Sequence, residues 1–435
     1  MADSKVQPEL IELSDDFPFT GNVSGTVADG SITDVKVSDM AASKLTGALP
    51  AVSGAALTNL PASYTKSASD PLITTNPSAV GALWVNQVSG ETYVCTDATT
   101  DNNVWTNVGA GSGDIQPWVF AGSTSGYTFG GSKGSGASTN SDHIDKYSFA
   151  SGAAAASSHV ASLPFSAAGT YSTIMNATHA YNMGGMQTTG PGNAHGLLTR
   201  FAFASDTQDN SITGYIENSG GISSQACLSA GDYGFVCGGY RGGASGLTDN
   251  VSKVSTVNDT NSTASSDLSR PTYQMAPATD NVYGYLANGY KGPPASTAGS
   301  TRIERMSFAS EVNSGEIGNT ASEGLTGSSG ISSSTHAYIP GIQSAVTSVH
   351  YSHAVKYAFA SAGITTSNAF AQSLIGDTYS HGCASSTSAG FMAMGVTTDN
   401  TQNNTIDTFL FASDTAVSNI GTLSRNGRDI ADAHV

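Results

Sequence analysis

The side chains best suited to catalysis are glutamates in the C-terminal half of the chain. Glycosidases use paired carboxyl groups, an acid and a base or nucleophile, that stand roughly 5 to 9 Å apart. The candidates are Glu304, Glu311, Glu316 and Glu323. No pattern in the sequence brings two of them together, and acidic loops are usually solvated. We therefore predict no catalytic residue, and a polysaccharide-cleaving enzyme is the alternative function.

A pair of histidines offers the best candidate for a metal site. His350 and His353 form a His-x-x-His pair of the kind that binds transition metals. However, His353 stands directly before an eight-residue segment that is equivalent to the one after His143, which favours a recurring surface side chain. We predict no metal and no cofactor.

The four cysteines show no zinc-like CxxC spacing and are too few and scattered for a disulfide framework. Cys227 and Cys237 fall on adjacent predicted strands, but a hairpin that turns at 229–232 does not place them opposite each other. We expect ordinary buried thiols, made in a reducing cytoplasm, with a disulfide as the alternative.

Aromatic and basic residues give the candidates for ligand binding. Tyr240-Arg241 and Tyr290-Lys291 follow equivalent glycines in two repeats, and Trp84 and Trp105 lie in a small aromatic-rich segment. An aromatic ring can stack on a sugar, and a cation can meet an acidic sugar or a phosphate. The alternative is structural: the tyrosines pack on a sheet edge, and the tryptophans form the core of a small module.

The tyrosine, arginine, lysine and glutamate candidates belong to an internal repeat that is marked by an octapeptide. Its copies begin at residues 144, 198, 251, 303, 354 and 406, with steps of 54, 53, 52, 51 and 52. They read IDKYSFAS, LTRFAFAS, VSKVSTVN, IERMSFAS, AVKYAFAS and IDTFLFAS. Apolar and polar side chains alternate, which predicts a strand, and Ser-Gly or Ser-Asp then supplies a turn.

A second element, small-aromatic-x-x-Gly-Gly, precedes each octapeptide by a similar distance. It reads GYTFGG, AYNMGG, GFVCGG, GYLANG, AYIPGI and GFMAMG, starting at 126, 180, 234, 284, 337 and 390. Short segments such as TYQMAPAT (272–279) complete a four-stranded unit. About 52 residues per four strands is typical of a propeller blade.

The repeat resembles the kelch repeat at this point. The double glycine is present at 130–131, 184–185 and 238–239, and LSRP (268–271) and LSRN (423–426) are similar to the kelch turn into the next blade. The kelch tryptophan is missing, and the glycine pair becomes Asn288-Gly289, Gly341-Ile342 and Met394-Gly395. The resemblance implies a six-bladed kelch-like β-propeller over residues 115–435.

The ends of the repeat region suggest how such a ring closes. The final segment RNGRDIADAHV has the place of the first strand of a unit, while the strand at 126–131 lacks one. We predict that the two pair, which removes an open sheet edge.

The N-terminal quarter has a different texture. Residues 29–61 resemble the shaft segments of bacteriophage tail fibres, in which three chains wind about one axis. Their regular but sparse apolar residues cannot form a monomeric core, whereas three copies share one. We predict a virion-attachment and trimerisation shaft over 1–70, with a disordered linker as the alternative. Residues 71–110 are predicted to form a small β-hairpin module that is common in phage fibres.

Composition narrows the possible partners. The chain has 50 glycines, 11% charged residues and a formal charge of −17, which indicates a turn-rich all-β protein that repels nucleic acid. No secretory signal and no apolar run of membrane-spanning length is visible. The resemblance of residues 29–61 to tail-fibre shafts then implies a homotrimeric tail fibre of the virion, assembled in the host cytoplasm. Its N-terminus would bind other tail proteins, and its propeller would bind a host surface glycan or outer-membrane protein.

Overall fold

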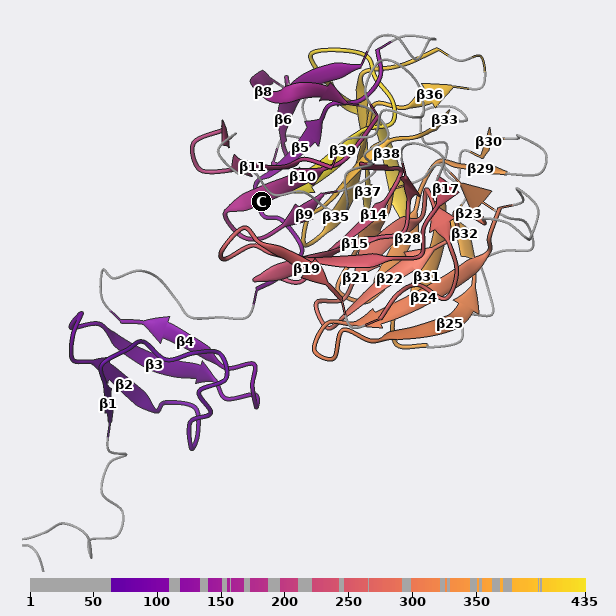
Figure 1. Cartoon of the computed structure of the whole chain (residues 1–435). Helices are drawn as coiled ribbons and strands as arrows, with labels where there is room; N and C mark the ends of the chain where they lie inside the picture. Colours follow the sequence, from indigo (N-terminus) through magenta and orange to yellow (C-terminus); the bar gives the residue numbers. More distant parts are fainter. Residues whose placement is uncertain are drawn as a thin grey trace, which may run out of the picture.

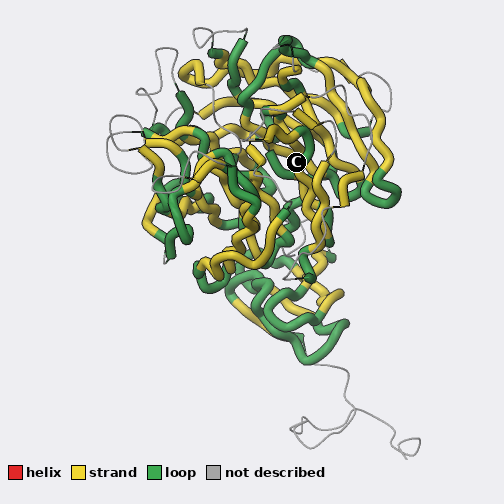
Figure 2. The backbone as a smooth tube through the Cα atoms, turned by 90° about the vertical axis from the view of Figure 1, so that its right-hand side faces the viewer, coloured by secondary structure: helices red, strands yellow, loops and turns green. Residues whose placement is uncertain are grey.

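The computed structural model describes most of the chain from residue 64 onward. The described residues are 64–108, 118–133, 140–150, 155–156, 158–167, 173–186, 196–209, 221–241, 246–264, 266–291, 299–320, 325–326, 329–344, 350–351, 354–361, 368–370, 378–397, 399 and 401–435. Residues 29–61, on which the shaft prediction rests, lie outside them. Every regular element described is a strand, and no helix occurs in this part of the chain (Figure 2). The predicted all-β class is confirmed.

The first sheet is the small module, drawn in indigo in Figure 1. Its order is β1–β2–β3–β4, with bounds Thr65–Ser67, Leu83–Asn86, Thr92–Asp97 and Val104–Asn107. The sheet therefore starts before residue 71, because β1 pairs in parallel with β2. Tyr93, Cys95 and Trp105 are buried together as its core.

The repeats fold into six sheets that share one strand order. The first three are β39–β5–β6–β8 (Ala431–His434, Ser125–Phe129, Ser141–Ser148, Ser158–Ala167), β9–β10–β11–β12 (Ile174–Met175, His179–Met183, Leu198–Ala202, Thr207–Asp209) and β14–β15–β18–β19 (Ala226–Ser229, Tyr233–Cys237, Val251–Ser255, Asn261–Thr263). The others are β21–β22–β24–β25 (Ala276–Thr279, Tyr283–Ala287, Arg302–Ser307, Asn313–Asn319), β27–β28–β31–β32 (Ile331–Ser332, His336–Ile339, Ala354–Ala358, Asn368–Phe370) and β34–β35–β37–β38 (Gly382–Ser385, Ala389–Ala393, Thr405–Leu410, Thr415–Thr422), to which β7 (Ala155–Ala156) adds a fifth strand. We number them sheets 1 to 6 in this order.

The two sequence elements of the repeat occupy the two middle strands of each sheet. In every sheet the aromatic residue of the second strand pairs with the third position of the octapeptide, for example Tyr127 with Lys146 and Tyr285 with Arg305. The same register recurs in the other sheets. A one-residue slip would move every side chain to the opposite face of its sheet, against a different neighbour, so the constant register follows from the alternating pattern.

The C-terminal strand completes sheet 1. β39 pairs antiparallel with β5, with Ala431 opposite Phe129 and His434 opposite Gly126. Figure 1 places the C-terminus beside β5 and β9. The predicted pairing of the final segment with the first aromatic strand is therefore confirmed.

Neighbouring sheets are joined by aromatic contacts between successive repeats. The ring of the second strand packs against the octapeptide Phe of the next repeat, as Tyr285 does with Phe359 at 4.7 Å between ring centroids. The equivalent pairs are Tyr127–Phe203, Phe235–Phe308, Tyr338–Phe411 and Phe391–Phe149. The last pair links sheet 6 to sheet 1. Repeat 3 has Thr256 at the Phe position, and there Tyr181 donates a hydrogen bond to the Thr256 carbonyl at 2.9 Å.

Ion pairs follow the same order. Five octapeptides carry Lys or Arg at the third position, and four of these side chains bind an acid just after the octapeptide of the next repeat. The pairs are Lys146–Asp206, Arg200–Asp259, Lys253–Glu311 and Lys356–Asp414. In repeat 5, Ala362 stands at the position where the other repeats of this series have the acid. The cation of repeat 4 that would bind such an acid, Arg305, lies over the Tyr283 ring instead. Partly exposed pairs stabilise a fold little, so their main effect is on which sheets meet.

Beyond the double glycine, four of the sheets continue into a short second sheet, which we call a ribbon. The ribbons are β13–β16–β17 (Ile222–Ser223, Tyr240–Arg241, Gly246–Leu247), β20–β23 (Thr272–Tyr273, Tyr290–Lys291), β26–β29–β30 (Leu325–Thr326, Ile342–Ser344, His350–Tyr351) and β33–β36 (Thr378–Tyr379, Val396–Thr397). In sheet 3 the bend lies at Gly238 and Gly239, with φ of 58° and 111°. A Cβ at Gly238 would collide with the carbonyl oxygen of Thr272 in the next sheet, so glycine is needed there.

Deletion of residues 427–435 tests the closing strand. Without β39, β5 loses its hydrogen-bonded neighbour and sheet 1 acquires an open edge. We expect aggregation or a large drop in melting temperature, measured by scanning calorimetry and light scattering. Deletion of residues 2–10 is the control, and a C-terminal deletion that melts like the parent would contradict the expectation.

Phe359→Ala tests the aromatic contact between sheets. Phe359 is 6% exposed and stacks on Tyr285, so its removal leaves a cavity between sheets 4 and 5. We expect a loss of about 3 to 5 kcal/mol in the free energy of unfolding, measured in urea. Val257→Ala, at a 74% exposed octapeptide position, should change stability by no more than about 0.5 kcal/mol. Equal effects of the two substitutions would rule out the contact as a major source of stability.

Candidate functional site

The predicted ligand-binding residues lie on the ribbons of sheets 3 and 4. Tyr240 and Arg241 form β16, and Tyr290 and Lys291 form β23, at matching positions beyond the glycine bend. All four side chains are half-buried. The structure thus places the two predicted pairs equivalently, on adjacent sheets.

A third tyrosine joins the two predicted ones. Tyr273 is the cross-strand partner of Tyr290, and the rings stack with centroids 5.1 Å apart at 19°. Burial raises the pKa of Tyr273, and the neighbouring Tyr290 and Tyr240 phenols raise it further. Tyr273 and Tyr290 thus stack on one ribbon, and Tyr240 on the neighbouring ribbon is near enough to influence Tyr273; we call these three residues the tyrosine row. Sequence reasoning placed Tyr273 on a strand but missed this role, although its register opposite Tyr290 is the signal for it.

The basic residues face the other side of the ribbons. Successive side chains of a strand point to opposite faces, so Arg241 and Lys291 point away from the face that carries Tyr240 and Tyr290. Their cross-strand partners are Ile222 and Thr272. The aromatic and basic halves of each predicted pair are therefore separate surfaces.

The opposite end of the sheets carries the entry of the chain into the repeats. Trp118 packs against the turn at Gly231, and the Phe120 N–H donates to the Asn281 side chain at 2.8 Å. Both turns connect the first two strands of their sheets, at the end away from the double glycines. A cavity beside Phe120 is lined by Met175 and His434. The tyrosine row thus lies at the end opposite to the chain's entry.

The tryptophans of the small module pack against each other at its core. Trp105 is 1% exposed, and its ring meets that of Trp84 edge-on at 5.9 Å. The half-buried Trp84 donates a hydrogen bond from Nε1 to the Ser69 carbonyl at 2.9 Å. Trp105 has no face open to a sugar, which matches the alternative interpretation of a module core.

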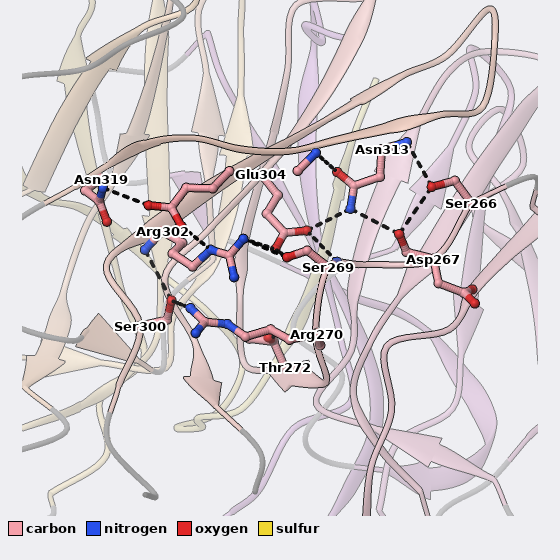
Figure 3. Close-up of polar contacts among 12 residues, drawn as sticks. Ser266, Asp267, Ser269, Arg270, Thr272, Ser300, Arg302, Glu304, Asn313 and Asn319 are labelled. Carbon is pink, nitrogen blue, oxygen red and sulfur yellow. Dashed lines mark hydrogen bonds and ion pairs between the residues drawn. The ribbon is translucent and has the colours of Figure 1, made fainter. Parts of the chain in front are cut away.

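Two of the candidate glutamates are brought together on sheet 4. Glu304 of β24 and Glu316 of β25 are cross-strand partners, and both bind Arg302, at 3.3 and 2.7 Å (Figure 3). Glu304 is 7% exposed, and it accepts hydrogen bonds from Ser269 and Asn313 as well. Both carboxylates are thus held by a cation, unlike a carboxyl pair that shares a substrate-sized gap.

The Glu304 contacts recur in another sheet, which indicates a structural role. Ser269 belongs to the LSRP turn and donates to Glu304 at the second octapeptide position of the next sheet. Ser424 of the LSRN turn donates in the same way to Asp145, at the same octapeptide position of sheet 1. A serine-carboxylate link between one repeat and the next explains both acids without catalysis.

The other candidate residues are dispersed. Glu311 pairs with Lys253, and Glu323 and His353 lie outside the described residues. His350 lies in β30. Among the described residues, no group of three or more His, Cys, Asp or Glu is arranged to hold a metal ion.

The four cysteines are buried and form no disulfide with one another. Cys227 pairs with Val236 and Cys237 pairs with Ala226, so the two side chains lie on opposite faces of one hairpin. This geometry rules out a disulfide between them without rearrangement and confirms the expectation from the hairpin.

Comparison with known proteins identifies no relative. No protein-family model matches the chain, and a search of curated proteins finds no significant match. In the part of the chain that the structure describes, no helix is long and apolar enough to cross a membrane.

Proposed function

We propose that the six sheets are the blades of a six-bladed kelch-like β-propeller. The proposal rests on three recurring features: one strand order, one register between the aromatic strand and the octapeptide, and contacts that run from each repeat to the next. The pairing of β39 with β5 and the Phe391–Phe149 stack supply the link between the last repeat and the first. A propeller of this kind holds loops rigidly at its two ends.

On this fold we propose a receptor-binding tail fibre of a bacteriophage virion. The observation that carries the proposal is the tyrosine row, at the end opposite to the chain's entry. A protein anchored by its N-terminus to other tail proteins presents this end outward. Half-buried tyrosines offer rigid aromatic area and hydroxyl groups, which suit a host surface glycan or the sugar-bearing part of an outer-membrane protein.

The alternative, a polysaccharide-cleaving tail enzyme, has weaker support. Its best carboxyl pair is Glu304 and Glu316, and Arg302 binds both. Because Arg302 contacts both carboxylates, the two carboxyl groups do not face the open gap that a scissile glycosidic bond needs between them. Binding without cleavage is the simpler use of these surfaces.

The triple variant Tyr240→Ala, Tyr273→Ala and Tyr290→Ala tests the proposed site. Loss of the stacking surface should reduce adsorption of the full-length protein to host cells by at least about tenfold. Adsorption is measured by flow cytometry with labelled protein, after circular dichroism has verified the fold. The matched control is Tyr283→Ala, a half-buried tyrosine on the same sheet at the opposite end.

Two outcomes would contradict this proposal. If the folded triple variant adsorbs as well as the parent, the tyrosine row is not the binding surface. If purified envelope polysaccharide is cut into oligosaccharides by the parent protein, the enzyme alternative is correct.

We also propose that the N-terminal shaft makes the protein a homotrimer. Its sparse apolar residues gain burial only when several chains share them. Light scattering should give three times the chain mass for the full-length protein and one chain mass for the fragment 115–435. A monomeric full-length protein would remove the physical basis of the fibre assignment.

A further inference from the structure

Many cations of this acidic chain are held by carboxylates. The chain carries 33 acidic and 16 basic residues. Seven described cations form ion pairs: Lys146, Arg200, Lys253, Arg302, Lys356, Arg425 and Arg428. Among the described residues, Arg270 and Lys291 lie outside these ion pairs, as do Lys66, Lys133 and Arg305. Arg270 and Lys291 both belong to the ribbon of sheet 4 or to the turn that leads into it.

Arg270 is partly buried and has a neutral hydrogen-bond partner. Its guanidinium donates to the Ser300 hydroxyl at 2.8 Å. In the view of Figure 3 it lies next to Ser300, below the Arg302 guanidinium. Burial lowers the pKa of Arg270, and the positive charge of Arg302 lowers it further. The nearby Glu304 and Glu316 both bind Arg302, so their negative charge is already shared with that guanidinium.

Lys291 lies close to Arg270 along the same ribbon. It is the cross-strand partner of Thr272, two residues after Arg270, and the Thr272 hydroxyl donates to the Arg270 carbonyl at 3.2 Å. Ser300 is joined to the strand before Lys291 by its N–H bond to the Gly289 carbonyl at 2.6 Å. The segment 292–298, GPPASTA, contains no acidic residue that could neutralise either cation. Arg270 and Lys291 thus place two cations at this edge of a protein whose net charge is strongly negative.

A partly desolvated cation beside a second cation is unfavourable unless an anion binds there. We propose that Arg270, Ser300 and Lys291 form a binding site for an oxyanion. The planar guanidinium still has N–H donors to offer after the bond to Ser300, and guanidinium forks suit carboxylate and phosphate oxygens. Lys291 adds a flexible ammonium that reaches the same ligand.

The site deepens the proposed function and rests on it for its biological ligand. It lies on the ribbon that also carries Tyr273 and Tyr290, but Lys291 points to the opposite face, so a glycan that stacks on the tyrosine row reaches the site by passing round the ribbon edge. The ligand class is a glycan that carries an anionic group, either the carboxylate of an acidic sugar or a phosphate. Both groups present negatively charged oxygens that a guanidinium such as that of Arg270 binds.

Calorimetric titration of the full-length protein with two probes tests the site. The probes are a short oligogalacturonate, which carries carboxylates, and inorganic phosphate, with a neutral maltooligosaccharide for comparison. We expect at least one anion to bind, more weakly as salt rises, and we expect Arg270→Gln to weaken that binding by about tenfold or more. The probe that binds more tightly identifies the source of the oxyanion.

Two further variants keep the test decisive. In the repeat of sheet 1, Lys133 occupies the position that Lys291 has in the repeat of sheet 4, but Ser132 stands in the place of Tyr290. Lys133→Gln is therefore the matched control. It should leave anion binding unchanged. Lys291→Gln should weaken binding even if Arg270→Gln proves poorly folded. In buffer without the probes, Arg270→Gln should melt no lower than the parent, because it removes a partly buried charge.

The proposal is wrong if neither anion binds, or if the folded Arg270→Gln and Lys291→Gln variants bind as tightly as the parent. These results are separable from those for receptor binding. Loss of adsorption in the triple tyrosine variant, together with anion binding that is independent of Arg270, overturns the oxyanion site alone. Anion binding that depends on Arg270, with normal adsorption of all variants, overturns the proposed function instead.

Discussion

The contact between one repeat's aromatic strand and the next repeat's octapeptide is the interaction on which the described sheets depend. Each four-stranded sheet is too small to bury its own side chains on both faces, so its apolar faces need neighbours. Tyr285 against Phe359 is typical, with both rings nearly inaccessible to water. Where Thr256 replaces the phenylalanine, a hydrogen bond from Tyr181 to the backbone maintains the same neighbour relation. Phe391 and Phe149 make the contact between the last sheet and the first, which the chain also joins by running from β38 into β39.

The glycine bend depends on these contacts in turn. It brings the backbone so close to the next sheet that the Gly239 N–H donates to the Thr272 carbonyl at 2.9 Å. The bend persists where glycine is absent, because Asn288 and Met394 take the same place with φ of 65° and 61°. A left-handed conformation is costly for methionine, so packing between sheets must impose it. The ribbons that carry Tyr240 and Tyr290 leave the sheets at this bend, and their direction is therefore fixed by the core.

The two ends of the sheets are used differently. The end with the first turns holds the entering chain through Trp118 and Phe120, together with the ion pairs between repeats. The end beyond the glycines carries the ribbons, whose tyrosines and cations vary from repeat to repeat. This division separates residues needed for assembly of the sheets from those free to suit a ligand. Arg270 has no carboxylate partner among the described residues because the neighbouring acids Glu304 and Glu316 both bind Arg302.

The sequence by itself determined the class, the repeat and its register. Alternating side chains at 144–151 and its copies specify strands, and the constant step of the repeat specifies equivalent sheets. The pairing of the C-terminal segment with the strand at 126–131 also followed, since each end lacked the strand that the other supplied. These features are local or periodic, so they can be read without coordinates.

Only the tertiary structure decided which distant side chains meet. Tyr273 lies 33 residues from Tyr240 in the sequence, and it joins the tyrosine row because the two ribbons lie on adjacent sheets. Glu304 and Glu316 came together through a cross-strand register that includes irregularities, which no alternation pattern predicts. The separation of Arg241 and Lys291 from their neighbouring tyrosines, and the lone position of Arg270, likewise depend on strand faces and on contacts between repeats. Such properties are set by packing over long sequence distances, whereas the sequence pattern records the spacing within each repeat.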